Sequence, residues 1–207
     1  MDDHPIVREG LRELLDRERD ITVQAEADRA ESAIEILRSQ TIDIAIVDLS
    51  LPGLSGIELI RNIHAEFEDL PIVVFSMHDE QFYAERALRA GARGYVMKEE
   101  ASEKLLEAIR QVNRGELFVS DEIAKKLLFR IVSGEGKDQQ PIHRLSDREL
   151  EVFQLIGQGY STRNIAEMLH LSIKTIESYR ANIKVKLDLK NASELMQHAV
   201  KWVEVNR

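Results

Sequence analysis

The sequence predicts an α/β domain with a parallel sheet, followed by a smaller domain built only of helices. Two observations carry this prediction. From residue 22 to residue 97, short apolar runs alternate with helical patterns, which is the rhythm of βα units around a parallel sheet. From residue 145 onward every segment has helical periodicity, and the polar stretch SGEGKDQQP before it is typical of a linker between domains.

Four short apolar segments are predicted as strands. Two of them, DIAIVD and PIVVFS, are hydrophobic almost throughout, as expected of strands whose two faces are both covered by helices. The four are ITVQA, DIAIVD, PIVVFS and GYVM, at residues 21–25, 43–48, 71–76 and 94–97.

Helices are predicted between these strands and after them. Segment 55–67 begins with a capping box of Ser55 and Glu58 and carries an apolar stripe at Ile60, Ile63 and Phe67. A helix that begins at Pro5 would turn Val7, Leu11 and Leu14 inward, and in a βα rhythm it should follow a strand. The remaining helices are predicted at 28–37, 80–90, 101–115 and 121–132.

The last third predicts four helices. Ser146 and Glu149 form a capping box at the start of the first, which ends at GQGYS. The others are STRNIAEMLH, SIKTIESYRANIKVKL and NASELMQHAVKWV. The predicted boundaries are therefore 1–117 for the first domain, 118–141 for a helix and linker, and 142–207 for the second domain.

Composition excludes several classes of protein. The 207 residues are 43% hydrophobic and 31% charged, so the chain can bury real cores. The absence of cysteine excludes disulfides and thiolate metal sites and favours a reducing compartment. No apolar run approaches the roughly 18 residues of a membrane span, and no secretory signal opens the chain. We expect a cytoplasmic protein without a membrane partner.

The charge is divided unevenly. Residues 1–140 have a net charge of −11 and residues 141–207 a net charge of +2, which together give the total of −9. An acidic first part suits cation binding, whereas a mildly basic second part can approach a polyanion.

Polar side chains follow the predicted strands at the edge of the sheet where ligands bind in open parallel sheets. Asp48 ends one strand, Ser76 ends the next, and Lys98 follows the last. Asp2 and Asp3 would join them if a strand preceded them. Carboxylate ligands without cysteine suit Mg²⁺ better than a transition metal.

Each of these residues has a chemical task in phosphoryl transfer. Asp48 is the candidate nucleophile, since a carboxylate that attacks phosphorus forms an acyl phosphate. Mg²⁺ on Asp2 and Asp3, with Lys98 opposite, would neutralise the charge of the phosphoryl group. Ser76 could donate a hydrogen bond to a phosphoryl oxygen. Each residue alone is more often a cap or a solvated side chain, but their convergence indicates a site.

The motifs MDDHPIV, VDLSLPGLSG, FSMHDE and GARGYVMK closely resemble the receiver domain of bacterial two-component response regulators. The resemblance implies a flavodoxin-like, doubly wound sheet in the order 2-1-3-4-5, and a cognate histidine kinase that phosphorylates Asp48. It also implies a metal site made of Asp2, Asp3, Asp48 and the main-chain carbonyl of Ser50. Ser76 and Lys98 would contact the phosphoryl group, and Tyr95 would change rotamer on activation. Pro52 and Gly56 match the loop that follows the phosphoacceptor.

The sequence departs from the receiver pattern at its front. Receivers place a buried hydrophobic strand directly before the acidic pair, at the centre of the sheet. Here that strand is missing, and its loss would leave backbone groups unpaired and a slot in the core. We expect that Met1 is not the natural start and that several residues precede it.

In the last third, the helix at Ile165–Leu169, the turn at HLS and the helix at Ile173–Leu187 form a helix-turn-helix pattern. Ile176, Ile183 and Leu187 share one face and should pack inward. On the opposite face Lys174, Ser178, Ala181 and Asn182 could enter a major groove and contact base edges. Phosphate contacts are predicted for Thr175, Arg180, Lys184, Lys186 and Lys190. A hairpin with lysines on its outside is also common in ordinary solvated bundles.

The segment from LSDRELEVF to MQHAVKW resembles the LuxR-type (NarL/FixJ) DNA-binding domain. It departs in Tyr179, where histidine is common, and in Glu177, a DNA-facing position where a base-contacting lysine sometimes sits. The resemblance implies double-stranded DNA as the partner, a homodimer on DNA and RNA polymerase as a further candidate partner. The last helix carries an apolar stripe suited to a dimer interface or to core packing: Ala192, Leu195, Met196, Ala199, Val200 and Val203. The six histidines show no metal-ligand spacing, so none is assigned as a ligand.

Three functions follow from these observations. The first is a DNA-binding response regulator that is not an enzyme beyond slow self-dephosphorylation: phosphorylation of Asp48 shifts a two-state receiver through Ser76 and Tyr95. The second is a Mg²⁺-dependent phosphohydrolase with Asp48 as nucleophile, which would need a general acid and a substrate lid. The third is a DNA-binding regulator whose degenerate receiver acts without phosphorylation.

Overall fold

The computed structural model describes residues 1–51, 54–100, 102–133 and 141–205, except for the side chains of residues 130, 131 and 133. The chain divides near residue 134 into two compact units, and each is described by itself. Pro52 and most of the predicted linker lie outside the described residues. No helix in the described part of the chain is long and apolar enough to cross a membrane.

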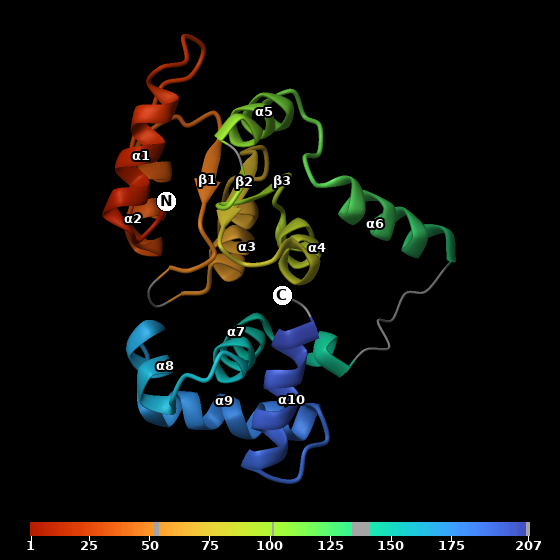
Figure 1. The fold of residues 1–207 in the computed structure, drawn as a ribbon. Coiled ribbons are helices and arrows are strands. Elements are labelled where there is room, and N and C mark those ends of the chain that lie inside the picture. The colour runs from red at the N-terminus through yellow and green to blue at the C-terminus, as the bar shows by residue number, and fades with distance from the viewer. Residues whose placement is uncertain (52–53, 101, 134–140, 206–207) are drawn as a thin grey trace. The chain divides into compact units, whose positions relative to one another are not determined.

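A parallel sheet of three strands forms the centre of the first unit (Figure 1). Strands β1 (Ala45–Val47), β2 (Ile72–Ser76) and β3 (Gly94–Met97) lie in that order. Their register pairs Ala45 with Ile72 and Val73 with Gly94. All three follow apolar runs that the sequence predicts as strands, and the predicted α/β class with a parallel sheet is confirmed.

Helices separate and flank these strands, as the alternating pattern predicts. The apolar face of α5 packs on β2 and β3 through Leu105, Leu106 and Ile109, which belong to the same core cluster as Val73 and Val96. The helices among the described residues of the first unit are α1 (Pro5–Leu15), α2 (Ala30–Ser39), α3 (Gly56–Glu66), α4 (Glu80–Ala90), α5 (Ser102–Asn113) and α6 (Asp121–Ser133).

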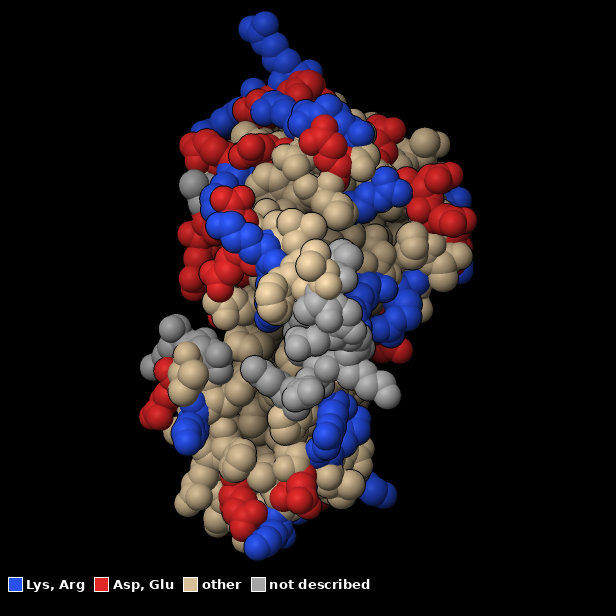
Figure 2. All heavy atoms as spheres, turned by 90° about the vertical axis from the view of Figure 1, so that its right-hand side faces the viewer, with Lys and Arg blue, Asp and Glu red and all other residues tan. Residues whose placement is uncertain are grey.

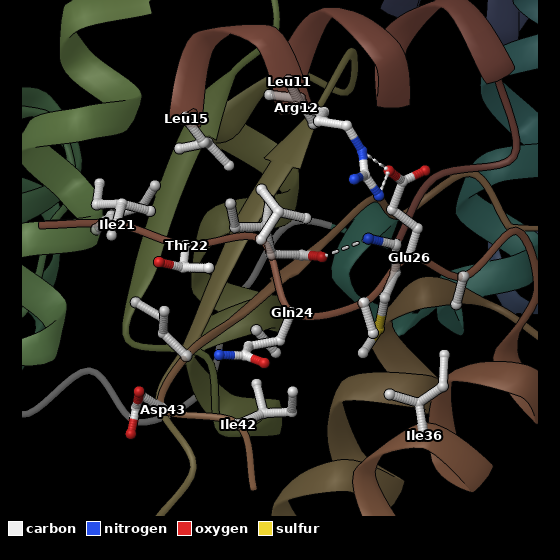
Figure 3. A pocket seen from close by; sticks show the side chains of 18 of the residues that line it. Leu11, Arg12, Leu15, Ile21, Thr22, Gln24, Glu26, Ile36, Ile42 and Asp43 are labelled. Carbon is white, nitrogen blue, oxygen red and sulfur yellow. Dashed lines mark hydrogen bonds and ion pairs between the residues drawn. The ribbon is translucent and has the colours of Figure 1, made fainter. Parts of the chain in front are cut away.

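The predicted strand at residues 21–25 is wrong, because this extended segment pairs with no strand in the described part of the chain. A cavity of about 440 Å³ separates it from β1. Figure 3 shows Leu11, Leu15, Ile21 and Ile36 around this cavity, with the Arg12–Glu26 ion pair at one side. Parallel pairing requires a neighbour at hydrogen-bonding distance, and the cavity stands where that neighbour would lie.

The first two residues bridge the cavity at one end. The Met1 amino group donates to the Ile46 carbonyl at 2.9 Å, and the Asp48 N–H donates to the Met1 carbonyl at 3.0 Å. On the other side, the Asp2 N–H donates to the Ala27 carbonyl at 3.1 Å. These bonds follow the pattern of a parallel ladder, so Met1 and Asp2 occupy the position of a strand end between β1 and the segment that follows α1.

The second unit consists of helices, as predicted. A short 3₁₀ turn (η1, Pro141–Arg144) that the sequence does not predict precedes them. They are α7 (Asp147–Gly157), α8 (Thr162–Met168), α9 (Ile173–Lys186) and α10 (Ala192–Val205). Their core includes the buried side chains of Phe153, Ile165, Ile176, Ile183 and Leu195. The helical class of this unit is confirmed.

The charges of the first unit are mixed on its surface. On the face drawn in Figure 2, acidic and basic side chains are interspersed over this unit. Several form ion pairs, among them Arg110 with Glu18 and Asp20, and Arg38 with Glu66. The carboxylates that carry functional interest are instead buried at the carboxyl edge of the sheet.

Candidate functional site

The three strands deliver the predicted polar residues to one edge of the sheet. Asp48 follows β1, Ser76 ends β2 and Lys98 follows β3, and the Lys98 N–H donates to the Ser76 carbonyl at 2.9 Å. Asp2 reaches the same edge because the backbone bonds of Met1 and Asp2 hold it beside β1. The structure therefore brings together Asp2, Asp48, Ser76 and Lys98, which lie far apart in the sequence.

A lysine joins the two buried carboxylates. Lys98 Nζ lies 2.6 Å from Asp48 Oδ2 and 2.6 Å from Asp2 Oδ2, and both aspartates are about 1% exposed. Burial lowers the pKa of Lys98, but the neighbouring charges of Asp48 and Asp2 and the hydrogen bonds to them raise it above its ordinary value. The ammonium therefore stays charged and balances carboxylates that burial alone would disfavour.

The acidic cluster fits a hard divalent cation. Asp2, Asp3, His4 and Asp48 each place one ligand atom within 4.8 Å of the others. Asp48 Oδ1 is buried and accepts no hydrogen bond from any described residue. An ionised oxygen in this position is unfavourable unless a cation or a donor meets it, and oxygen donors at this density suit Mg²⁺.

His4 lies closer to this cluster than the sequence indicates. Its Nδ1 is 2.8 Å from Asp3 Oδ1 and 3.5 Å from Asp2 Oδ1, and its backbone N–H donates to Asp2 Oδ1 at 2.9 Å. Spacing among the histidines could not show this, because the partners are the two adjacent aspartates. We leave His4 outside the ligand set, since its ring is already directed at Asp3.

The predicted switch residues are linked through His78. The Tyr95 hydroxyl, on a side chain about 1% exposed, donates to the His78 carbonyl at 2.7 Å. The His78 ring stacks on Tyr83 and lies 3.2 Å from the Ser50 hydroxyl. The His78 N–H in turn donates to Ser76 Oγ at 3.4 Å. Burial raises the pKa of Tyr95 well above its ordinary value, so its hydroxyl remains a donor.

Gly56 allows α3 to start against the acceptor loop. A Cβ at this position would lie 2.3 Å from the Leu49 Cα and 2.6 Å from the Asp48 carbonyl oxygen. Ser55 caps the helix by accepting the Glu58 N–H, as the capping box predicts. The close approach explains the glycine in the loop that follows Asp48.

In the second unit, α8 and α9 form the predicted helix-turn-helix. His170 takes a left-handed conformation (φ 53°) in the turn, and Ser172 caps α9 by accepting the Thr175 N–H. Ile176 and Ile183 of α9 face inward and are fully buried. The opposite face leaves Lys174, Glu177, Ser178, Ala181 and Asn182 exposed, and Thr175, Arg180 and Lys184 partly exposed.

Two of the predicted phosphate contacts are engaged within the protein. The Thr175 hydroxyl lies 2.8 Å from the Ser172 hydroxyl in the cap, and Lys186 Nζ lies 2.5 Å from Glu149 Oε2. The apolar stripe of α10 is also divided: Leu195 and Ala199 are buried, whereas Ala192 and Met196 are exposed. Leu195 and Ala199 therefore belong to the core of this unit, whereas Ala192 and Met196 are accessible on its surface.

Comparison with known proteins assigns both units. Residues 1–110 match the model of the response regulator receiver domain, and residues 143–199 match that of bacterial regulatory proteins of the luxR family. The chain belongs to the LuxR-family response regulators. Its two units thus correspond to a receiver and a helix-turn-helix DNA-binding domain.

Individual relatives resemble this response regulator along nearly its whole length. It is 36% identical over 206 residues to the oxygen regulatory protein NreC of Staphylococcus carnosus, covering 97% of this chain and 94% of the relative. It is 30% identical to the transcriptional regulatory protein DegU of Brevibacillus brevis, with 99% and 94% covered. A structure of RcsB from Salmonella enterica serovar Typhimurium, bound to promoter P1flhDC with the phosphomimetic BeF3-, has a TM-score of 0.63 at 32% identity and covers 96% of this chain and 95% of RcsB.

Proposed function

We propose that this response regulator is switched by phosphorylation of Asp48 and binds double-stranded DNA as a dimer through α9. The observation that carries the first half is Asp48 itself: one oxygen is held by Lys98, and the other is buried and meets no donor among the described residues. A carboxylate can act as a nucleophile toward phosphorus, and Asp48 places a ligand atom within 4.8 Å of those of Asp2 and Asp3, where a cation would neutralise the phosphoryl charge.

In the proposed phosphoryl transfer, Asp48 is the nucleophile and its neighbours stabilise the phosphoryl group. An oxygen of Asp48 forms a bond to phosphorus while the bond from phosphorus to the donor breaks, and the leaving group takes the electron pair. A cognate histidine kinase would supply the phosphoryl group from a phosphorylated imidazole. Mg²⁺, held by Asp2, Asp3, Asp48 and the main-chain carbonyl of Ser50, would neutralise phosphoryl charge. Lys98 would pair with a phosphoryl oxygen and Ser76 would donate to one, and slow hydrolysis of the acyl phosphate would reset the protein.

The DNA-binding half is supported by the exposed face of α9. Lys174, Ser178, Ala181 and Asn182 are small or polar, as a face that enters a major groove must be, and Arg180 and Lys184 flank it. Because residues 141–207 carry a net charge of only +2, one copy would bind weakly. Two copies on adjacent half-sites gain affinity through multivalency, which supports a homodimer on DNA. Solved RcsB structures include complexes with DNA and two dimers on two DNAs.

Labelling tests this proposal. The protein is incubated with acetyl phosphate and Mg²⁺, and intact mass identifies the adduct. We expect a single phosphoryl group that requires Mg²⁺ and disappears in Asp48→Asn, together with tighter binding to DNA fragments selected from the genome. A Ser39→Ala variant serves as the control, since this exposed serine at the end of α2 donates to the Ile36 carbonyl of its own helix.

A second candidate is a regulator that acts without phosphorylation. The cavity between β1 and residues 21–25 favours it, because it leaves the backbone beside Asp2 and Asp48 without packed support on that side. Equal DNA affinity for the parent and Asp48→Asn, with and without acetyl phosphate, would establish this candidate. The phosphohydrolase is not retained, because the family consists of regulators and the match covers both units.

A further inference from the structure

An ion pair ties the end of α9 to the start of α7. Glu149 Oε2 lies 2.5 Å from Lys186 Nζ and accepts the Ser146 N–H at 2.7 Å. Glu149 belongs to the capping box at the N-terminal end of α7, and Lys186 is the last residue of α9. One carboxylate therefore closes the cap of one helix and holds the end of another.

The environment of this pair favours the charged form of Glu149. The Glu149 side chain is 4% exposed and that of Lys186 is 38% exposed. Burial raises the pKa of Glu149, but the Lys186 ammonium and the hydrogen bonds from Ser146 outweigh it and lower the pKa below its ordinary value. Removal of Lys186 from this carboxylate would leave a buried negative charge that, among the described residues, is met only by Ser146 of the cap, whose N–H donates to it, which is strongly unfavourable.

Other lysines of α9 are in a different situation. Within the described residues, the ammonium groups of Lys174 and Lys184 make no hydrogen bond or ion pair, so they can meet a phosphate without breaking an existing contact. Lys186 already gives one of its three N–H donors to Glu149, so a phosphate would have to share the ammonium with this buried carboxylate. Position on the helix alone does not distinguish these residues, because all three are basic and at least partly exposed.

We propose that Lys186 is a positioning residue that fixes the direction of α9 against α7 through Glu149, and that it does not neutralise a DNA phosphate. This proposal rests on the proposed function, in which α9 lies on DNA. Ile176 and Ile183 pack α9 against the core of its own domain. The ion pair at the C-terminal end of α9 keeps the helix from rotating about this apolar contact. The side chains of Lys174, Ser178 and Asn182 then keep a fixed orientation toward the DNA groove.

Salt dependence of DNA affinity separates the two roles. Each phosphate neutralised by a lysine contributes about 0.9 to the slope of log affinity against log salt concentration on duplex DNA. The phosphorylated full-length protein is titrated onto a duplex of random sequence at several salt concentrations. Lys184→Met is the phosphate-contact control and should lower the slope by about 0.9. The double variant Glu149→Gln/Lys186→Met removes both charges of the pair without changing the net charge, and it should keep the parent slope.

Single variants test the positioning itself on a selected DNA fragment. Lys186→Met should bind it about tenfold more weakly at every salt concentration, whereas Lys186→Arg, which can still reach Glu149, should stay within about twofold of the parent. Circular dichroism on the same samples shows that the helices are intact. If Lys186→Met does not fold, the double variant and Lys186→Arg still decide the question.

Two results would overturn the proposal in distinguishable ways. A slope lowered by about 0.9 in the double variant would make Lys186 a phosphate contact while leaving the proposed function intact. Absence of salt-dependent DNA binding by the parent protein would instead refute the proposed function, and the positioning role would fall with it.

Discussion

A segment that fills the cavity between β1 and residues 21–25 should stabilise the receiver. The change is an extension of five apolar residues, rich in valine and isoleucine, ahead of Met1; five is the length of β2. Met1 and Asp2 already bond to Ile46, Asp48 and Ala27 in a parallel ladder, so the extension would continue this ladder into the cavity. It would also replace the buried Met1 amino group, whose pKa burial lowers, by a neutral peptide amide.

The expected gain follows from burial, hydrogen bonding and entropy. Each buried side chain contributes about 2 kcal/mol and each new ladder bond about 1 kcal/mol, whereas ordering costs about 1.5 kcal/mol per residue. For five side chains, one ladder bond per residue and five ordered residues, the net gain is about 7 kcal/mol, which corresponds to a rise in melting temperature of roughly 20 to 30 °C. The lining supports this magnitude, since Leu11, Leu15, Ile21 and Ile36 face the cavity (Figure 3).

Differential scanning calorimetry and amide hydrogen exchange measure the effect. A matched control carries five Gly and Ser residues in place of the apolar ones, with the same length and the same removal of the amino group at Met1. The apolar extension should raise the melting temperature above the control and protect amides of residues 21–25 from exchange. Equal melting temperatures, or unprotected amides at Val23 and Ala25, would refute the reasoning.

Three further outcomes are expected. Gly56→Ala should destabilise the receiver by about 2 kcal/mol in urea unfolding, because its Cβ would meet the Leu49 backbone at 2.3 Å; an unchanged midpoint would contradict this. Tyr95→Phe should cost about 1 kcal/mol, because the bond to the His78 carbonyl is lost, and a smaller loss would mean that another donor replaces it. Because the pKa of Glu149 is lower in the folded protein than its ordinary value of 4.5, its ionised form stabilises the DNA-binding domain at pH values above 4.5. This stabilisation should disappear as the pH falls through the lowered pKa. Helix content followed against pH should show this loss in the parent but not in Glu149→Gln, and parallel curves would disprove the assignment.

Much of the fold follows from local patterns in the sequence. The apolar runs at β1, β2 and β3 and the caps at Ser55 and Ser146 are encoded by neighbouring residues, and the structure forms them where they are predicted. The segment at 21–25 has the same local pattern and forms no strand. This segment has the composition of a strand, but a strand forms only when a neighbouring strand hydrogen-bonds to it. A local pattern carries no information about whether that neighbour is present.

The contacts of the functional residues also divide into those that the sequence predicts and those that only the structure shows. Strand ends at one edge of a parallel sheet converge by topology, so Asp48, Ser76 and Lys98 could be predicted together. The contacts of His78 and the Glu149–Lys186 pair could not, because they join residues from different elements without periodic spacing. Helical periodicity assigns Lys186 to the surface, and only its distance to Glu149 shows that it is engaged.

The shared ammonium of Lys98 connects chemistry at the acceptor to the anchoring of the amino-terminal segment. Asp48 and Asp2 both pair with it, so under the proposed function a phosphoryl group that draws Lys98 toward itself would also weaken its ion pair with Asp2. α1 begins three residues after Asp2, so under the proposed function modification of Asp48 would weaken the attachment of this helix to the sheet. A change in the protease sensitivity of α1 would then report the signalling state from the opposite end of the receiver sequence.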